Sequence, residues 1–138
     1  MAAVVRSVHL SHRTLAMPSP DPERQQRYRK GHVAEWIAAG YLILKGYRIL
    51  ARRHRTRYGE IDLIAVRGRR VAFVEVKRRA TVDEGFASLE GEQSQRIANA
   101  AEAWMAKNPA YAYHDYGFDA VLIVPRRWPD HLIDGLRS

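Results

Sequence analysis

The stretch that decides the fold is Gly59-Glu-Ile-Asp-Leu-Ile-Ala-Val66, followed after three residues by Arg70-Val-Ala-Phe-Val-Glu-Val-Lys-Arg-Arg79. Both segments are rich in β-branched and aromatic residues, and the first alternates between polar and apolar side chains, which predicts two β-strands. The Gly68-Arg69 pair between them places glycine at the first central position of a two-residue loop, where a type II′ turn requires a positive φ. We therefore expect a tight antiparallel hairpin.

This hairpin register brings acidic side chains together. With Gly68-Arg69 as the loop, counting outward places Asp62 directly opposite Glu75. The same count places Glu60 opposite Lys77. Like charges at directly opposed positions, about 5 Å apart, destabilise a sheet, so the two acids need a divalent cation, a shared proton or a nearby basic side chain. Oxygen ligands in a chain without cysteine favour Mg²⁺ or Mn²⁺. The alternative is an exposed polar face with a Glu60–Lys77 ion pair.

The remaining elements follow from hydrophobic periodicity and from the positions of glycine and proline. They are a helix over 23–45, a strand over 47–53, a loop over 81–91, a helix over 92–108, a strand over 117–125 and a short strand within 126–138. The helix over 92–108 can act as a crossover that makes the strand after it parallel to the strand over 70–79. The order α-β-β-β-α-β predicts an α/β fold with a mixed central sheet flanked by helices.

Length and composition limit the class of protein. A chain of 138 residues with 46% hydrophobic residues predicts one globular domain, over residues 23–138, after a disordered N-terminal extension over residues 1–22. The longest apolar run, residues 36–44, is too short to cross a bilayer, and the first residues lack the apolar stretch of a secretory signal. Together with the absence of cysteine, this favours the cytoplasm and excludes thiolate chemistry.

The net charge of +8 is concentrated in one block. Residues 45–80 contain twelve Lys and Arg against three acids, whereas residues 81–138 contain five against nine. Such a block is typical of a surface that binds the phosphates of a nucleic acid, although a solvated basic surface is the competing interpretation. His54 and Tyr58 within it are interpreted as surface or packing residues. The candidate nucleic-acid-binding residues are Arg52, Arg53, Arg55, Arg57, Arg78 and Arg79.

Two further polar residues lie on the predicted helices. Glu35 is the only charge within an apolar helical segment, so it needs a partner, and it could join Asp62 and Glu75 if that helix packs on their face of the sheet. Its alternative role is that of an acid in the first turn of a shorter helix, stabilised by the helix dipole. Gln93 lies on the apolar stripe of the helix over 92–108 and either points at the sheet or caps the helix.

These residues resemble a known pattern. Asp62 followed by Glu75-Val-Lys77 is similar to the Asp…Glu-x-Lys signature of the restriction-endonuclease-like nuclease superfamily. Together with Lys30-Gly-His-Val-Ala-Glu35 and Gly117-Phe-Asp119, the chain more narrowly resembles the YraN-like family, related to archaeal Holliday junction resolvases, over about residues 25–125. The fold of that family, a mixed central sheet flanked by helices, agrees with the order of elements given above.

The resemblance implies a metal-dependent endonuclease that hydrolyses phosphodiester bonds in DNA, with branched or junction DNA in repair or recombination as its substrate. It implies that Asp62, Glu75 and Glu35 hold Mg²⁺ or Mn²⁺ and that Lys77 positions or activates the attacking water. Symmetric incision of a four-way junction would also require a homodimer. The alternative is a non-catalytic nucleic-acid-binding module that retains the nuclease fold. The secondary candidates for the site are Glu60 and Gln93.

Overall fold

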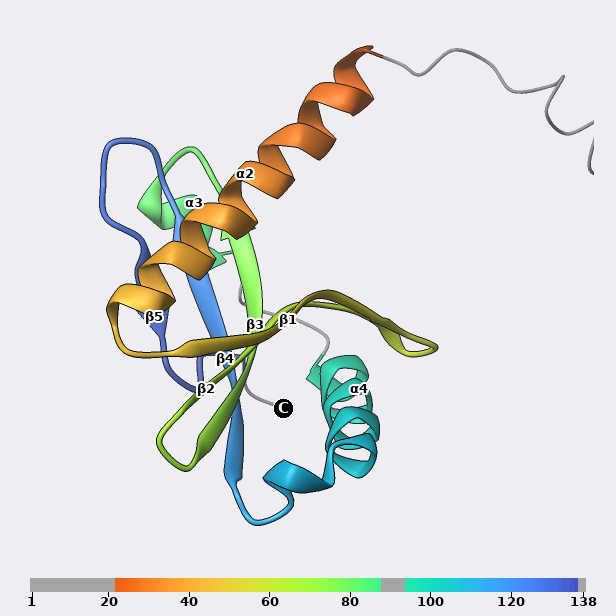
Figure 1. Ribbon diagram of the computed structural model, residues 1–138. Helices are drawn as coiled ribbons and strands as arrows, with labels where there is room; N and C mark the ends of the chain where they lie inside the picture. Colours follow the sequence, from red (N-terminus) through yellow and green to blue (C-terminus); the bar gives the residue numbers. More distant parts are fainter. Residues whose placement is uncertain (1–21, 88–93, 137–138) are drawn as a thin grey trace, which may run out of the picture. The chain divides into compact units, whose positions relative to one another are not determined.

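The structure is a computed structural model that describes residues 22–87 and 94–136 (Figure 1). The predicted extension over residues 1–22 lies outside these ranges except for Pro22, and Gln93 lies outside them as well. The chain divides into two units, residues 1–30 and residues 31–138, and the sheet and its packing belong to the second. In the two described ranges, no helix is both long and apolar enough to cross a membrane.

The elements follow the predicted order. They are α2 (Pro22–Leu44), β1 (Arg48–Thr56), β2 (Gly59–Arg67), β3 (Arg70–Arg78), α3 (Val82–Ala87), α4 (Ser94–Lys107), the 3₁₀ helix η1 (Pro109–Tyr111), β4 (Asp115–Ile123) and β5 (Asp130–Leu132). They form a five-stranded sheet in the order β1-β2-β3-β4-β5. The pair β3–β4 is parallel and the other neighbours are antiparallel. This confirms the mixed α/β sheet flanked by helices, which is consistent with a nuclease-like fold.

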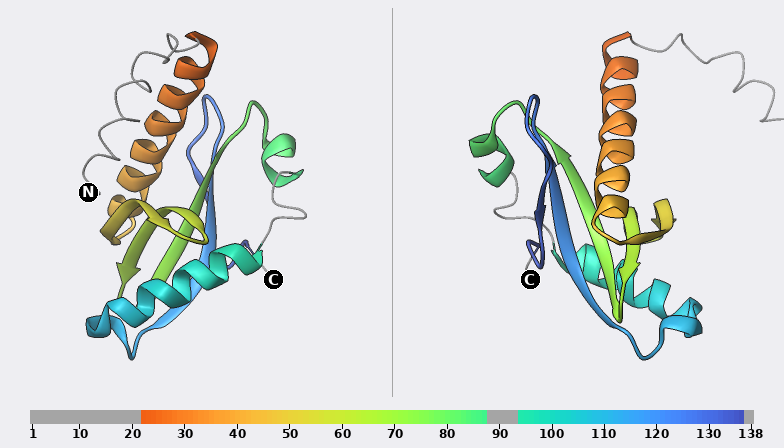
Figure 2. Two further views of the ribbon diagram at one scale, coloured as in Figure 1. Left: turned by 90° about the vertical axis from the view of Figure 1, so that its right-hand side faces the viewer. Right: turned by 60° about the vertical axis from the view of Figure 1, so that its left-hand side comes forward.

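Two apolar clusters form the core, one between α2 and the sheet and one between α4 and the sheet. The ribbons of α2 and α4 lie against the sheet in Figure 2. In the first cluster, small residues of α2 such as Ala34 and Ala38 allow the helix to approach the buried side chains of β2 and β3 closely. In the second, the predicted apolar stripe of α4 packs on the sheet, and the ring of Trp104 meets Phe73 edge to face at 5.7 Å. The sheet is therefore covered on both faces, which buries its central strands β2 and β3.

The central hairpin forms with the predicted turn. Gly68 has φ +60°, and Arg67 pairs with Arg70. The predicted register holds from there to the pair Leu63–Val74, where the ladder between β2 and β3 ends. The expected direct pairs Asp62–Glu75 and Glu60–Lys77 are therefore not part of this ladder. The backbone N–H of Val76 instead donates to Asp62 Oδ2 at 2.8 Å, so a side chain takes the position of a backbone acceptor.

The prediction of a loop over residues 81–91 is wrong for its first half, because the helix α3 occupies Val82–Ala87. The reason is local capping. Thr81 Oγ1 accepts a hydrogen bond from the backbone N–H of Glu84, and the Glu84 carboxylate accepts one from the N–H of Ala80. This Thr-x-x-Glu spacing is the helix-start signal called a capping box. The strands β1 and β4 also differ from their predicted bounds, since β1 continues to Thr56 and β4 begins at Asp115.

Candidate functional site

The candidate site lies where β2 and β3 separate. The residues that come next after the last paired positions, Leu63 and Val74, are the acids Asp62 and Glu75. Asp62 is held between the strands by the N–H of Val76. The negative charge of Glu75 acts on Asp62, so the two carboxylates are close enough to interact although they are not a ladder pair. The directly opposed pair that the register predicted is therefore wrong, although the charges of the two acids still act on each other.

Asp62 is the most strongly perturbed acid of this site. Its pKa is raised from 3.8 to about 7. Burial is the largest cause, the hydrogen bond from Val76 opposes it, and the charges of Glu75, Glu35 and Glu60 add to the increase. An acid with this pKa is only partly ionised at neutral pH. A cation beside it would stabilise the ionised form.

Glu75 is held by two basic side chains. Lys77 Nζ lies 2.8 Å from Glu75 Oε2, and both side chains are largely buried, with 15% and 16% of their surface exposed. Arg96 of α4 approaches the other carboxylate oxygen of Glu75 at 3.8 Å and donates to the backbone carbonyl of Glu60 at 3.3 Å. Arg96 therefore ties α4 to both strands of the site.

Glu35 comes to the site from α2. It is 8% exposed, and its Oε1 is buried without a hydrogen-bond partner among the described residues. Burial raises its pKa, against the nearby charges of Arg53 and His32, which lower it. The negative charge of Glu60 also raises the pKa of Glu35. Glu60 Oε2 lies 3.9 Å from Arg53 Nε and 3.6 Å from Arg55 Nε. The charges of Glu75, Glu35 and Glu60 all act on Asp62. We call these four acids the acidic neighbourhood.

The donor chemistry of this neighbourhood fits a hard cation, because carboxylate oxygens are the preferred ligands of Mg²⁺ and Mn²⁺. In the ranges 22–87 and 94–136, however, no three His, Asp or Glu side chains are grouped closely enough to hold one ion. Mg²⁺ commonly takes only one or two carboxylates and completes its shell with water and substrate phosphates. Asp62 and Glu75 fit that pattern, and the three-acid set that includes Glu35 stays a prediction.

The predicted phosphate-binding arginines divide into separate environments, beginning with a pair on β1. Arg53, with φ +52°, is directed at Glu60 and Glu35 of the acidic neighbourhood. Its neighbour Arg52 stacks on the exposed ring of Trp36, with 3.9 Å between the guanidinium carbon and the ring centroid. Arg53 is therefore engaged by the acids, whereas Arg52 stays exposed beside Trp36.

The other four arginines lie in two separate places. Arg55 and Arg57 line a groove between the β1–β2 hairpin and α4. Arg78 lines a small pocket with Arg126 and Arg127, and Arg79 donates to the backbone carbonyl of Arg78. Binding of nucleic acid by these residues stays a prediction.

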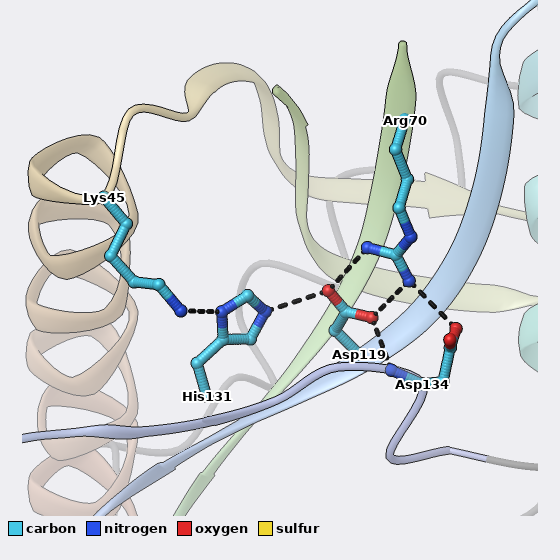
Figure 3. A network of polar contacts seen from close by, with 5 residues as sticks. All are labelled: Lys45, Arg70, Asp119, His131 and Asp134. Atoms are coloured by element: carbon cyan, nitrogen blue, oxygen red, sulfur yellow. Dashed lines mark hydrogen bonds and ion pairs between the residues drawn. The ribbon is translucent and has the colours of Figure 1, made fainter. Parts of the chain in front are cut away.

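A second polar cluster, which the sequence analysis did not assign, lies around Asp119 (Figure 3). Asp119 is fully buried and accepts hydrogen bonds from both terminal nitrogens of Arg70, at 2.8 and 3.1 Å, and from the backbone N–H of Asp134 at 2.9 Å. His131 Nε2 lies 2.9 Å from Asp119 Oδ2, the oxygen that also accepts the longer bond from Arg70. Lys45 Nζ lies 2.6 Å from His131 Nδ1. Since an ammonium group only donates, Nδ1 accepts and the ring proton lies on Nε2.

This cluster joins the segment after α2 to β3, β4 and β5. Burial alone would raise the pKa of Asp119, but the hydrogen bonds from His131, Arg70 and Asp134 outweigh it and lower the pKa to about 2. Both oxygens of Asp119 are occupied by donors, which favours a structural role over catalysis. Asp119 lies in the Gly117-Phe-Asp119 motif, and the signal that could have identified the cluster is an acid within a strand that is otherwise buried on both faces.

Comparison with known proteins decides the family. The model of an uncharacterised protein family, UPF0102, matches residues 34–123. The chain belongs to the UPF0102 family. This is the YraN family that the motifs predict, and the match includes Glu35, Asp62, Glu75 and Lys77.

Similar UPF0102 proteins come from several bacteria. The protein mlr4633 of Mesorhizobium japonicum is 51% identical over 113 residues, which cover 82% of this chain and 90% of that protein. A UPF0102 protein of Rhodopseudomonas palustris strain BisA53 is 50% identical over 121 residues, which cover 88% and 93% of the two chains. The protein bll0669 of Bradyrhizobium diazoefficiens is 49% identical over 112 residues, covering 81% and 84%. The names of these relatives state no activity.

Sequence reasoning also missed Arg96. It directly precedes Ile97 on α4, and Ile97 belongs to the stripe that packs on the sheet. A basic residue at the edge of that stripe, near the start of the helix, was a detectable sign that α4 contributes a charge to the site. Gln93, the residue of this helix that the sequence analysis selected, lies outside the described residues.

Proposed function

We propose that this UPF0102 protein is a metal-dependent nuclease that hydrolyses phosphodiester bonds in DNA, with branched or junction DNA in repair or recombination as its substrate. The observation that carries the proposal is the open end of the β2–β3 hairpin. There Asp62 is fixed by the N–H of Val76 and lies within reach of Glu75, whose carboxylate is 2.8 Å from Lys77 Nζ. A DNA substrate of this kind agrees with a cytoplasmic protein and, for a symmetric junction, with a homodimer.

The chemistry divides among the residues as follows. Asp62 and Glu75 would hold Mg²⁺ or Mn²⁺, which when bound lowers the pKa of a water ligand and neutralises charge on the phosphate. Lys77 balances the charge of Glu75 before the substrate arrives and provides an ammonium group that positions the attacking water. Arg96 is a positioning residue, because it holds Glu75 and the backbone of Glu60 in place.

The alternative is a non-catalytic nucleic-acid-binding module. The basic block over residues 45–80 would serve either function. The module, however, gives no role to a set of acids whose burial and mutual repulsion oppose folding. For this reason we prefer the nuclease.

A cleavage panel tests the proposal. Labelled linear duplex, flapped duplex, four-way junction, single-stranded DNA and RNA are each incubated with Mg²⁺, Mn²⁺ or EDTA. We expect the parent to cleave at least one DNA substrate only when a cation is present, and Asp62→Asn to lose that activity. Asp115→Asn, which changes an exposed acid at the start of β4, is the matched control and should cleave like the parent. A parent that binds these substrates but cleaves none would contradict the proposal and support the binding module.

A further inference from the structure

A groove of about 570 Å³ lies between the tip of the β1–β2 hairpin and the C-terminal half of α4. Its lining residues are His54, Arg55, Thr56, Arg57, Tyr58, Ala103, Trp104 and Lys107. The volume is within the range of sites that hold a small ligand. The lining includes three cationic side chains and two aromatic rings and contains no acid. This composition combines the two features that recognise a nucleotide, namely positive charge for a phosphate and aromatic surface for a base.

The aromatic part of the groove is built into the fold. Trp104 is 6% exposed and held by Phe73, so it forms a fixed wall. Tyr58 lies at the hairpin tip, where its backbone N–H donates to Thr56 Oγ1 at 3.0 Å. Arg57 donates to the Tyr58 hydroxyl at 3.0 Å, and its guanidinium lies 5.1 Å from the ring centroid. Tyr58 is therefore oriented by its neighbours, and its half-buried ring packs on the core cluster beneath α4 while part of it stays exposed.

The groove adjoins the acidic site. Arg55 lines the groove and is ion-paired with Glu60 of the acidic neighbourhood at 3.6 Å. Tyr58 lies in the turn before β2 and four residues before Asp62, so the two residues are at most about 13 Å apart along the chain. A few nucleotides of a single strand can span that distance. A strand whose scissile phosphate lies at Asp62 can therefore also reach the groove.

We infer that this groove binds an unpaired nucleotide of the substrate strand next to the cleavage site, with its base against Tyr58 and its phosphate near Arg57 and Lys107. The inference rests on the proposed function and adds a substrate class, DNA with a single-stranded segment. An unpaired base is favoured because a base within a duplex has both faces covered by its neighbours and offers no face to an aromatic ring. A convex basic surface would suffice for duplex phosphates, whereas this site is concave.

Binding without cleavage tests the inference. Fluorescence anisotropy in Ca²⁺ or EDTA compares a labelled single strand, the same strand in a blunt duplex, and a duplex with a single-stranded overhang. We expect the parent to bind the single strand and the overhang more tightly than the blunt duplex. Tyr58→Leu should weaken binding of the single strand about tenfold and leave blunt duplex binding nearly unchanged. Tyr58→Phe keeps the ring and should bind like the parent.

The charge of the groove is tested by matched double variants. Arg57→Gln with Lys107→Gln should reduce the slope of log K against log salt for a single strand by about 0.7 for each lost phosphate contact. Arg67→Gln with Arg69→Gln removes the same charge from the exposed turn at the opposite end of β2 and should change this slope less. Thermal melting confirms that each variant is folded. Equal effects of the two double variants, equal effects of Tyr58→Leu and Tyr58→Phe, or tighter binding of blunt duplex would each overturn the inference.

The outcome is separable from that of the proposed function. Binding at the groove is measured without a cation that supports cleavage, whereas the nuclease proposal depends on cleavage that Asp62→Asn abolishes. Cleavage with a failed groove test means that the substrate strand takes another path. A successful groove test without cleavage means that the protein binds single strands as a non-catalytic module.

Discussion

The raised pKa of Asp62 predicts how the stability of the protein depends on pH. This pKa is about 7 in the folded chain, against an ordinary value of 3.8. Because the folded pKa is the higher one, the unfolded chain loses this proton first as pH rises, and stability falls between about pH 4 and pH 7. The difference of about 3 pKa units corresponds to about 4 kcal/mol of free energy of unfolding above pH 7. At pH 5 the loss is about 2 kcal/mol.

Asp62→Asn removes this titration while keeping a side-chain oxygen that can accept the N–H of Val76. We therefore expect the stability of Asp62→Asn relative to the parent to increase as pH rises. The difference in free energy of unfolding between variant and parent should be about 2 kcal/mol larger at pH 8 than at pH 5. Urea denaturation in EDTA at the two pH values measures this difference. The exposed-acid control Asp115→Asn should show no such trend.

The same reasoning predicts the effect of a cation. Mg²⁺ or Mn²⁺ binds the ionised form of Asp62, so it should stabilise the parent at pH 8 and stabilise Asp62→Asn much less. If the stabilities of parent and variant run parallel from pH 5 to pH 8, Asp62 is not a buried acid of raised pKa, and the electrostatic account of the site is wrong.

Three further expected outcomes concern the scaffold. Asp119→Asn should lower the free energy of unfolding by about 3 kcal/mol, because Arg70 loses a buried partner, as measured by chemical denaturation at pH 7. The parent should lose about 2 kcal/mol of its free energy of unfolding as pH falls from about 4 to 2, because the buried Asp119 carboxylate, whose pKa is lowered from 3.8 to about 2 in the folded chain, is protonated over that range. Acid titration followed by circular dichroism measures this loss. Gly59→Ala should lower the free energy of unfolding by about 1–3 kcal/mol, because Gly59 has φ +127° and an added Cβ would lie 2.7 Å from Arg96. Gly40→Ala, in open space on α2, should be neutral or stabilising, and thermal melting compares the two variants.

The fold could be predicted because its signals are local. The Gly68-Arg69 turn fixed the register of the hairpin, and the apolar stripe of α4 identified the face that covers the sheet. The helix α3 was missed even though the spacing of Thr81 and Glu84 indicates a capped helix start. That error came from overlooking a signal, since the information was present in the sequence.

The site was predictable only in part. The hairpin count brings Asp62 and Glu75 together, but it cannot show that the strands separate at this point and that Val76 bonds to a side chain. This separation depends on packing between distant elements. The same is true of Arg96 and of the cluster around Asp119, whose members come from four separate parts of the chain.

The measurement that tests the nuclease most directly compares cleavage and DNA binding of Glu75→Gln with those of Glu102→Gln, which changes an exposed acid on α4. Both are assayed on the best substrate of the parent with Mg²⁺ or Mn²⁺, and binding is assayed in Ca²⁺. We predict that Glu75→Gln abolishes cation-dependent cleavage and binds DNA as tightly as the parent or more tightly, because a negative charge near the phosphate is removed. Glu102→Gln should match the parent in both assays. Undiminished cleavage by Glu75→Gln would contradict the account.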